Sequence, residues 1–211
     1  ATDGAVLATV KQGRKVLAGW RDKRVGQVSG GHLAATLKGL PVGGPYEVKL
    51  SAGKASVTVS GVLVGDVWLL GGQSNMQGVG LVADGMKPNP AVRCFYMNDT
   101  WAVAEDPLHH LANAQDEVHW KACGLKAPNP WPTAKPVTGV GPGLPFGLEM
   151  HQRTGVPQGL IAAAHGGTSM TQWDPKRRDE GGASLYGAMI RRLRKNGGQV
   201  AGMIWYQGES D

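Results

Sequence analysis

The stretch that decides the fold is VLVGDVWLLGGQS, residues 62–74. It begins with a nearly continuous apolar run from Val62 to Leu70, which is typical of a strand buried on both faces of a parallel sheet. Two glycines follow and permit a tight turn, so that Ser74 lies just beyond the carboxyl end of the strand. Because open α/β sheets bind ligands at that end, the position favours a catalytic serine. The alternative is that Ser74 only caps a helix.

Apolar runs of strand length recur further along the chain. They span Arg93–Met97, Gly159–Ala164 and Val200–Tyr206. An amphipathic helix is predicted between the last two runs, with Ser184 as its N-cap and Gly197 as its stop. A second helix is predicted over residues 145–154, whereas residues 98–142 show no periodicity and are expected to form a long loop region. This alternation indicates a doubly wound α/β sheet.

The first part of the chain has a different pattern. Short segments such as Tyr46–Leu50 and Ala55–Val59 alternate polar and apolar residues, and glycine-rich turns separate them. Such alternation is typical of antiparallel strands with one solvated face. We therefore predict a β-rich unit over residues 1–61 and an α/β domain over residues 62–211.

The net charge of +6 arises from 22 basic and 16 acidic residues in a chain of 211. The densest basic segment, residues 176–195, is interleaved with acidic side chains and lacks an aromatic stacking pattern. A solvated helix face explains it better than a nucleic-acid site, so no nucleic-acid partner is expected.

The two cysteines, Cys94 and Cys123, are too few for a disulfide framework and have no metal-ligand companions, although one bridge between them stays open. No apolar run reaches the length of a membrane span. The start, ATDG, lacks a signal sequence, which fits either a cytoplasmic protein or one whose signal was removed.

Two more strand ends offer groups that suit acyl transfer. The segment His165-Gly166-Gly167 follows the third apolar run, and glycines there allow backbone N–H groups to approach a ligand closely. Gln207 follows the last run and carries an uncharged amide donor. A serine hydroxyl, a glycine N–H and an amide at neighbouring strand ends are the components of a nucleophile with an oxyanion hole.

Three motifs carry a family resemblance: GDVWLLGGQSNMQG (65–78), HGGTSMTQW (165–173) and IWYQGESD (204–211). In order and spacing they resemble the sialate O-acetylesterase branch of the SGNH hydrolases, the GDSL-like carbohydrate esterases. The stretch GLPVGGPYEVKL (39–50) is similar to the β-rich lead-in of that branch. The resemblance implies a three-layer α/β/α, flavodoxin-like SGNH hydrolase fold behind an N-terminal β-rich unit.

The resemblance also implies residue roles and a substrate class. Ser74 would be the nucleophile. Our own candidates for substrate contacts are Asn75, which follows it, and Trp173, whose ring could stack on a sugar. The implied oxyanion hole consists of the backbone N–H groups of Ser74 and of Gly166 or Gly167, with the side chain of Gln207. The implied reaction removes O-acetyl groups from a sugar through an acetyl-serine intermediate and needs no metal or cofactor. Acetylated xylan or another carbohydrate ester is the alternative substrate.

The family's final motif, an aspartate and a histidine three residues apart, is expected on a loop after the third block and is not found there. A serine nucleophile needs such a base, and His165 is better explained as a structural residue. We therefore expect a companion C-terminal polypeptide to carry the catalytic Asp and His. A catalytically silent carbohydrate-binding relative is the other interpretation. Because sugar-deacetylating relatives are often exported, a secreted or periplasmic location is expected.

Overall fold

The computed structural model describes residues 3–129 and 136–211. Contacts within the chain divide it into two units, Ala1–Gly65 and Asp66–Asp211. The first unit is an antiparallel sheet in the order β4-β3-β1-β5-β6, with β2 paired to β1. Its strands are β1 (Gly4–Gln12), β2 (Lys15–Val16), β3 (Lys23–Ser29), β4 (His32–Ala35), β5 (Gly43–Ala52) and β6 (Ala55–Val64). Val10, Trp20, Tyr46 and Val48 form its buried core.

The apolar run that opens the α/β unit belongs to two strands rather than one. Val64 ends β6 and pairs with Gly43 in the antiparallel sheet, whereas Asp66 opens β7 (Asp66–Gly72) and pairs with Gln158 in the parallel one. The prediction of a single strand over Val62–Leu70 was therefore wrong at its start. Apolar content alone did not distinguish the end of one sheet from the beginning of the next.

The second unit is built on a sheet in the order β10-β9-β12-β7-β13. Its strands are β9 (Val92–Phe95), β10 (Trp101–Val103), β12 (Gln158–Ala162) and β13 (Gly202–Tyr206), together with β7. β9, β12, β7 and β13 are mutually parallel, and β10 is antiparallel to β9. The predicted parallel sheet is confirmed, and β7 lies between β12 and β13 within it.

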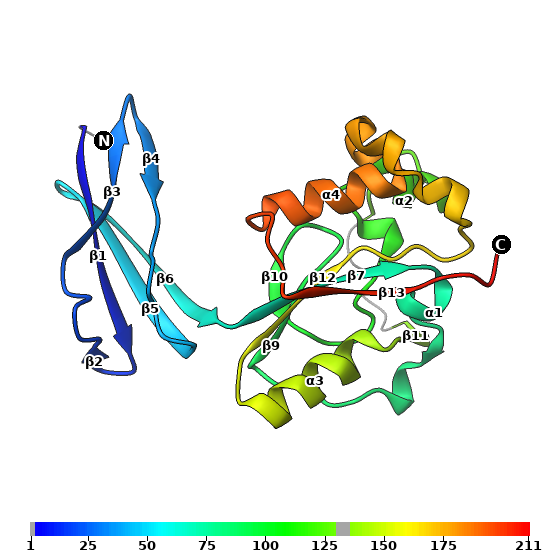
Figure 1. The fold of residues 1–211 in the computed structure, drawn as a ribbon, viewed down its shortest axis with the longest axis horizontal. Helices are drawn as coiled ribbons and strands as arrows, with labels where there is room; N and C mark the ends of the chain where they lie inside the picture. Colours follow the sequence, from blue (N-terminus) through cyan, green and yellow to red (C-terminus); the bar gives the residue numbers. More distant parts are fainter. Residues whose placement is uncertain (1–2, 130–135) are drawn as a thin grey trace. The chain divides into compact units, whose positions relative to one another are not determined.

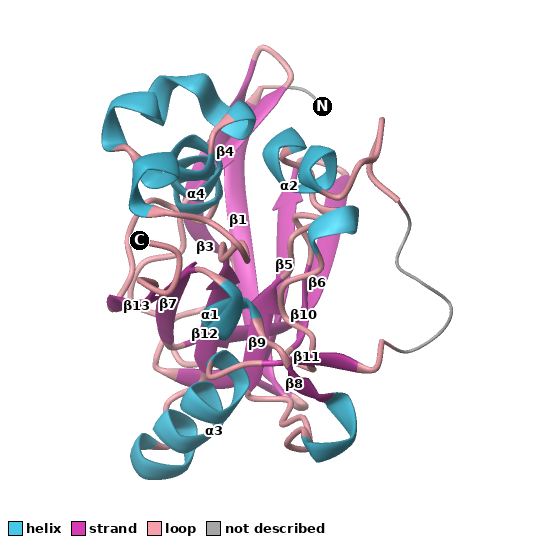
Figure 2. Ribbon diagram, turned by 90° about the vertical axis from the view of Figure 1, so that its right-hand side faces the viewer, coloured by secondary structure: helices cyan, strands magenta, loops and turns pink. Residues whose placement is uncertain are grey.

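Helices cover both faces of this sheet (Figures 1 and 2). α3 (Gly143–Thr154) contributes Leu144 to a core cluster with Leu70 and Leu160, and α4 (Leu185–Lys195) contributes Met189 to a second cluster with Ile161. Leu69 and Leu70 belong to different clusters because successive side chains of a strand point to opposite faces. Both predicted helices are confirmed.

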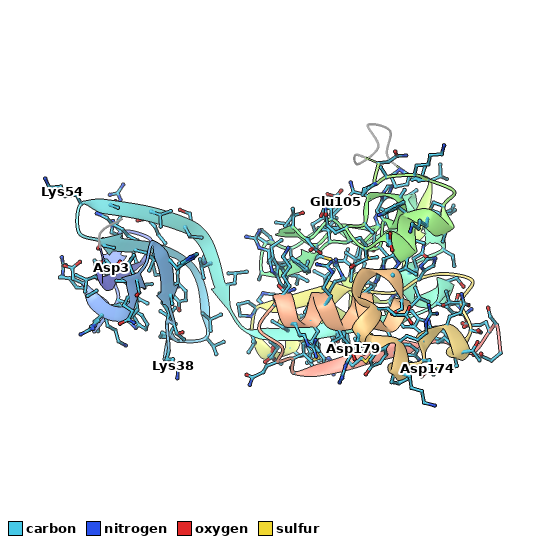
Figure 3. All side chains as sticks on the ribbon, turned by 90° about the horizontal axis from the view of Figure 1, so that it is seen from above. Asp3, Lys38, Lys54, Glu105, Asp174 and Asp179 are labelled. Atoms are coloured by element: carbon cyan, nitrogen blue, oxygen red, sulfur yellow. The ribbon has the colours of Figure 1, made fainter. Side chains whose placement is uncertain are left out.

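The ends of these two helices follow the predicted signals. The side chain of Ser184 accepts a hydrogen bond from the N–H of Gly187 at the start of α4. Gly155 ends α3 in the left-handed region, with φ of 70°. Figure 3 labels Asp174 and Asp179 on the segment that precedes α4. In that segment Arg177 pairs with Glu180 at 2.8 Å, at an exposed position.

The connecting segments hold several short elements. They are α1 (Ser74–Gln77), β8 (Gly80–Leu81), η1 (Val82–Asp84), η2 (Leu111–Asn113), α2 (Glu117–Ala122), β11 (Thr138–Val140), η3 (Met170–Trp173) and η4 (Pro175–Ala183). The region predicted as a loop thus contains α2 and two short strands, which are too brief to give a periodic pattern. Among the helices of the described ranges, none has the length and apolarity needed to cross a bilayer.

β13 forms one edge of the parallel sheet and is less buried than predicted. Met203, Trp205 and Tyr206 are exposed by 43%, 37% and 50%. Among the described strands, β13 pairs with β7 alone, so this part of the chain leaves one side of β13 without a neighbouring strand. Trp205 still packs edge-on against Trp173, with ring centroids 5.1 Å apart.

A fully buried arginine, Arg192 of α4, joins two strands of the sheet at their carboxyl ends. Its guanidinium donates hydrogen bonds to the carbonyl oxygens of Phe95 (2.8 Å), Tyr96 (2.7 Å), Met97 (3.2 Å) and Ala162 (2.8 Å). It also donates one to Asp99 Oδ1 at 2.7 Å. The buried charge is therefore paired and its donors are satisfied, as burial requires.

Replacing this arginine should destabilise the second unit strongly. Arg192→Met leaves strand-end carbonyls without donors, and loss of one partner of a buried charged network lowers the free energy of unfolding by about 3 to 5 kcal/mol. Arg194→Met, on the exposed face of the same helix, should change it by no more than about 0.5 kcal/mol. Urea unfolding measures both variants. If both variants lowered the free energy of unfolding by the same small amount, the stabilising role assigned to Arg192 would be contradicted.

Candidate active site

Three strand ends are joined by backbone hydrogen bonds where the predicted site residues lie. The N–H of Gln73, after β7, donates to the carbonyl oxygen of Tyr206 at the end of β13, at 2.9 Å. The N–H of His165, after β12, donates to the carbonyl oxygen of Gly72 at 2.9 Å. The segments that carry Ser74, Gly166 and Gln207 therefore meet at one edge of the sheet, as predicted for parallel strands.

The turn before the serine requires glycine. Gly72 has φ of +129°, and a Cβ atom there would lie 2.0 Å from the carbonyl oxygen of Tyr206. Ser74 then opens α1 and is partly buried. Among the described residues, the hydrogen bonds of the His109, His119, His151 and His165 rings go to partners other than Ser74. The serine is thus held at a tight turn with none of these four rings hydrogen-bonded to it.

The glycine loop lies directly against this serine. A Cβ atom on Gly166 would be 3.4 Å from Ser74 Cβ. The N–H of Gly166 donates to Oε1 of Gln77 at 2.6 Å, while the N–H of Gly167 has no acceptor among the residues that the structure describes. The two glycines of the predicted oxyanion hole therefore differ, and Gly167 is the one whose donor is available.

Gln207 connects its strand end to the other two. Its Nε2 atom donates to the carbonyl oxygen of Thr168 at 3.2 Å and lies 3.5 Å from Gln73 Oε1. It also donates to the carboxylate of Asp211, which in turn accepts the N–H of Met170 at 2.8 Å. A substrate oxyanion would have to replace one of these acceptors to receive the Gln207 amide.

The two predicted substrate contacts have different environments. Asn75 follows the serine and its amide donates to Glu209, so it joins the first strand end to the last. Trp173 is only 2% exposed, and its indole N–H donates to Thr168 Oγ1 at 3.0 Å. Thr168 Oγ1 donates to the carbonyl oxygen of His165 at 2.7 Å. The burial of Trp173 does not fit a substrate contact, and its ring supports the glycine loop from behind.

Three buried histidines lie behind this loop, and sequence reasoning did not connect them. Nδ1 of His165 and Nδ1 of His119 are 2.9 Å apart, so one ring donates to the other. His109 Nδ1 lies 3.2 Å from the carbonyl oxygen of Gln77. Burial lowers the pKa of His109 to about 3 and that of His165 to about 4, and it holds the pKa of His119 well below the usual range. All three are neutral at pH 7.

A cavity of about 400 Å³ opens beside the glycine loop. It is lined by Leu111, Val118, Ala122, Cys123, His165, Gly166, Gly167, Thr168, Gln172 and Leu185. Because His165 is neutral at pH 7, these side chains carry no formal charge when Cys123 is a thiol. Gly166 and Gly167 belong to its wall, which is mixed apolar and polar, whereas Ser74 and Gln207 do not line it.

The remaining candidate groups do not add a metal site. Cys94 is buried and Cys123 is exposed, and neither forms a disulfide. No cluster of histidine, cysteine or acidic side chains that could hold a metal ion occurs in the described ranges.

Comparison with known proteins identifies the class. Residues 64–211 match the family described as carbohydrate esterase, sialic acid-specific acetylesterase. The chain belongs to this family of carbohydrate esterases, as the motifs predicted.

Individual relatives agree with this assignment. The chain is 30% identical over 166 residues to the Arabidopsis thaliana protein named probable carbohydrate esterase At4g34215, covering 69% of this chain and 54% of that protein. It is 29% identical over 252 residues to a sialate O-acetylesterase of Pongo abelii, covering 100% of this chain and 44% of that protein. The chain spans about half the length of these relatives.

A solved structure shares the fold. The crystal structure of XAC1771, a carbohydrate acetylesterase from Xanthomonas citri, matches with a TM-score of 0.55 and 24% identity. The match covers 98% of this chain and 45% of that one.

The buried histidines predict a pH dependence of stability. Their pKa values are lower in the folded state than the ordinary value near 6.5, so the unfolded chain binds more protons as the pH falls below that value. The free energy of unfolding should therefore fall between pH 7 and pH 5, by up to about 1.4 kcal/mol per pH unit for each histidine.

Chemical unfolding at several pH values checks this. His165→Gln should reduce the slope, whereas Gln152→Met, at an exposed position that carries no titratable group, should retain it. A slope that His165→Gln leaves unchanged would contradict the assignment of His165 to the titrating cluster.

Proposed function

We propose that this chain carries the nucleophile and oxyanion hole of a serine esterase that removes O-acetyl groups from a sugar. The observation that supports the proposal is the meeting of Ser74, Gly167 and Gln207 at the carboxyl ends of three adjacent parallel strands. Membership of a carbohydrate esterase family supports the same chemistry. The helices on both sheet faces suit the proposed three-layer SGNH hydrolase arrangement.

In the proposed reaction, Ser74 Oγ attacks the acetyl carbonyl carbon and loses its proton to a histidine base. The carbonyl oxygen becomes an oxyanion, which the N–H groups of Ser74 and Gly167 and the amide of Gln207 stabilise. Such donors contribute about 3 to 4 kcal/mol each when they are aimed at the developing charge. The bond between the acyl carbon and the sugar oxygen then breaks, and the histidine protonates that departing oxygen to give the sugar hydroxyl. Water attacks acetyl-Ser74 next and releases acetate.

The base is proposed to be the histidine of the family's final motif. The family resemblance pairs this histidine with an aspartate three residues away. His165 is a poor substitute, because its Nδ1 is paired with His119 and its pKa is about 4. An exported location remains a prediction that accompanies this function.

Covalent labelling of the catalytically complete protein tests the proposal. A serine-directed phosphonate should add one label at Ser74, located by peptide mapping. The rate of acetate release should fall in proportion to the fraction of protein that is labelled. Ser74→Ala should lose both labelling and turnover, whereas Ser56→Ala, at an exposed position of β6, should retain them. Sugar binding without labelling or turnover would favour the silent carbohydrate-binding relative instead.

Acidic groups near the proposed nucleophile favour a neutral sugar as a second candidate substrate. Glu209 accepts a hydrogen bond from Asn75, and Asp211 accepts one from Gln207. These carboxylates would repel the carboxylate of a sialate. An acetylated neutral saccharide such as acetylated xylan would meet no such repulsion.

The relative rates for the two esters distinguish the two substrates. The catalytically complete protein should hydrolyse an acetylated xylo-oligosaccharide with a higher kcat/KM than an O-acetyl sialate. Preference for the sialate ester would contradict the neutral-sugar candidate.

A further inference from the structure

Gln77 has no role in the reaction described above, yet it contacts the oxyanion loop directly. It is the last residue of α1, three positions after Ser74. Residues three apart lie on the same face of a helix. The side chain of Gln77 is therefore on the face of α1 that carries the nucleophile.

Two contacts fix Gln77 in place. Its Oε1 atom accepts the N–H of Gly166 at 2.6 Å, and its backbone N–H donates to the carbonyl oxygen of Gln73 at 2.8 Å. A Cβ atom on Gly166 would lie 2.9 Å from the same Oε1 atom and 3.4 Å from Ser74 Cβ. Gly166 thus lies against both ends of α1, and its N–H points at Gln77 rather than toward a ligand.

We propose that Gln77 is a positioning residue of the esterase site. By taking the N–H of Gly166, it fixes the glycine loop relative to Ser74 and leaves the N–H of Gly167 as the donor of that loop. This role rests on the proposed function. An isolated loop of two glycines would sample many backbone states, since glycine has the widest conformational freedom. A side-chain acceptor from the nucleophile's own helix restricts that freedom at the point where alignment matters.

The energetic consequence concerns the transition state. The distance from the Gly167 N–H to the substrate oxygen has little effect on the binding energy while that oxygen is a neutral carbonyl. It has a large effect on the energy of the transition state, in which the oxygen becomes an oxyanion. Loss of the Gln77 contact should therefore lower kcat more than it raises KM. A residue that only filled space would affect the stability of the fold and leave both kcat and KM of the folded enzyme unchanged.

The test uses Gln77→Met, which retains the length of the side chain and removes the strong acceptor, in the catalytically complete protein. Gln77→Met should lower kcat by about 10- to 100-fold with little change in KM, the size expected from a misplaced catalytic group. Gln152→Met, at an exposed position of α3, is the matched control and should keep both constants. The melting temperatures of the two variants should remain close to that of the parent.

Amide hydrogen exchange at Gly166 supplies a readout independent of activity. Exchange should become about 10-fold faster or more in Gln77→Met, because the opened amide loses its hydrogen bond. Gln77→Glu keeps an acceptor oxygen and should retain slow exchange.

Faster exchange with reduced kcat supports the role. Faster exchange with unchanged kcat, or unchanged exchange, overturns it. If the parent protein hydrolyses no acetyl ester, the proposed function fails and the role fails with it, while the exchange rates still report separately whether Gln77 holds Gly166.

Discussion

The buried guanidinium of Arg192 is the interaction on which the rest of the site depends. It donates to carbonyl oxygens at the ends of both β9 and β12, and to the carboxylate of Asp99. A buried guanidinium is stable only when its N–H donors are hydrogen-bonded and its charge is paired. α4 and the two strand ends must therefore come together in one arrangement. β12 then leads, three residues beyond Ala162, to His165 and the glycine loop.

A chain of hydrogen bonds connects the end of β12 to the segment that carries Ser74. The N–H of His165 binds the carbonyl oxygen of Gly72, and the N–H of Gly166 binds the side chain of Gln77. Thr168 and Trp173 support the loop from its buried side. A site that stabilises a developing charge needs donors whose directions are set before the reaction begins. The buried groups around this loop provide that constraint, although none of them is itself a donor to the substrate.

The sequence predicted those features that depend on chain order alone. Ser74, Gly167 and Gln207 follow parallel strands, and the carboxyl ends of adjacent parallel strands necessarily share an edge. α4 was predictable because Ser184 caps it and its apolar face repeats with helical spacing. The separation of β6 from β7 was not, because both segments are apolar and only their pairing partners differ.

Contacts between separate loops were beyond sequence reasoning. His109, His119 and His165 lie on three different segments with no motif around the first two, and only folding brings them together. Arg192 resembled the other arginines of its helix until its burial was known. Trp173 was assigned to the substrate because an aromatic ring can stack on a sugar, whereas its ring is buried and its indole N–H binds Thr168.

The neutral charge state of the buried histidines affects how the proposed oxyanion hole stabilises negative charge. An imidazole pair such as His119 and His165 satisfies its own donor and acceptor without carrying a charge. A buried carboxylate in the same place would oppose an oxyanion at Gly167, and a buried cation would attract the ground-state ester and the product acetate as well as the transition state. Only interactions that strengthen in the transition state accelerate the reaction. A rigid, uncharged support therefore leaves the backbone N–H groups and the Gln207 amide as the groups that respond when the negative charge develops.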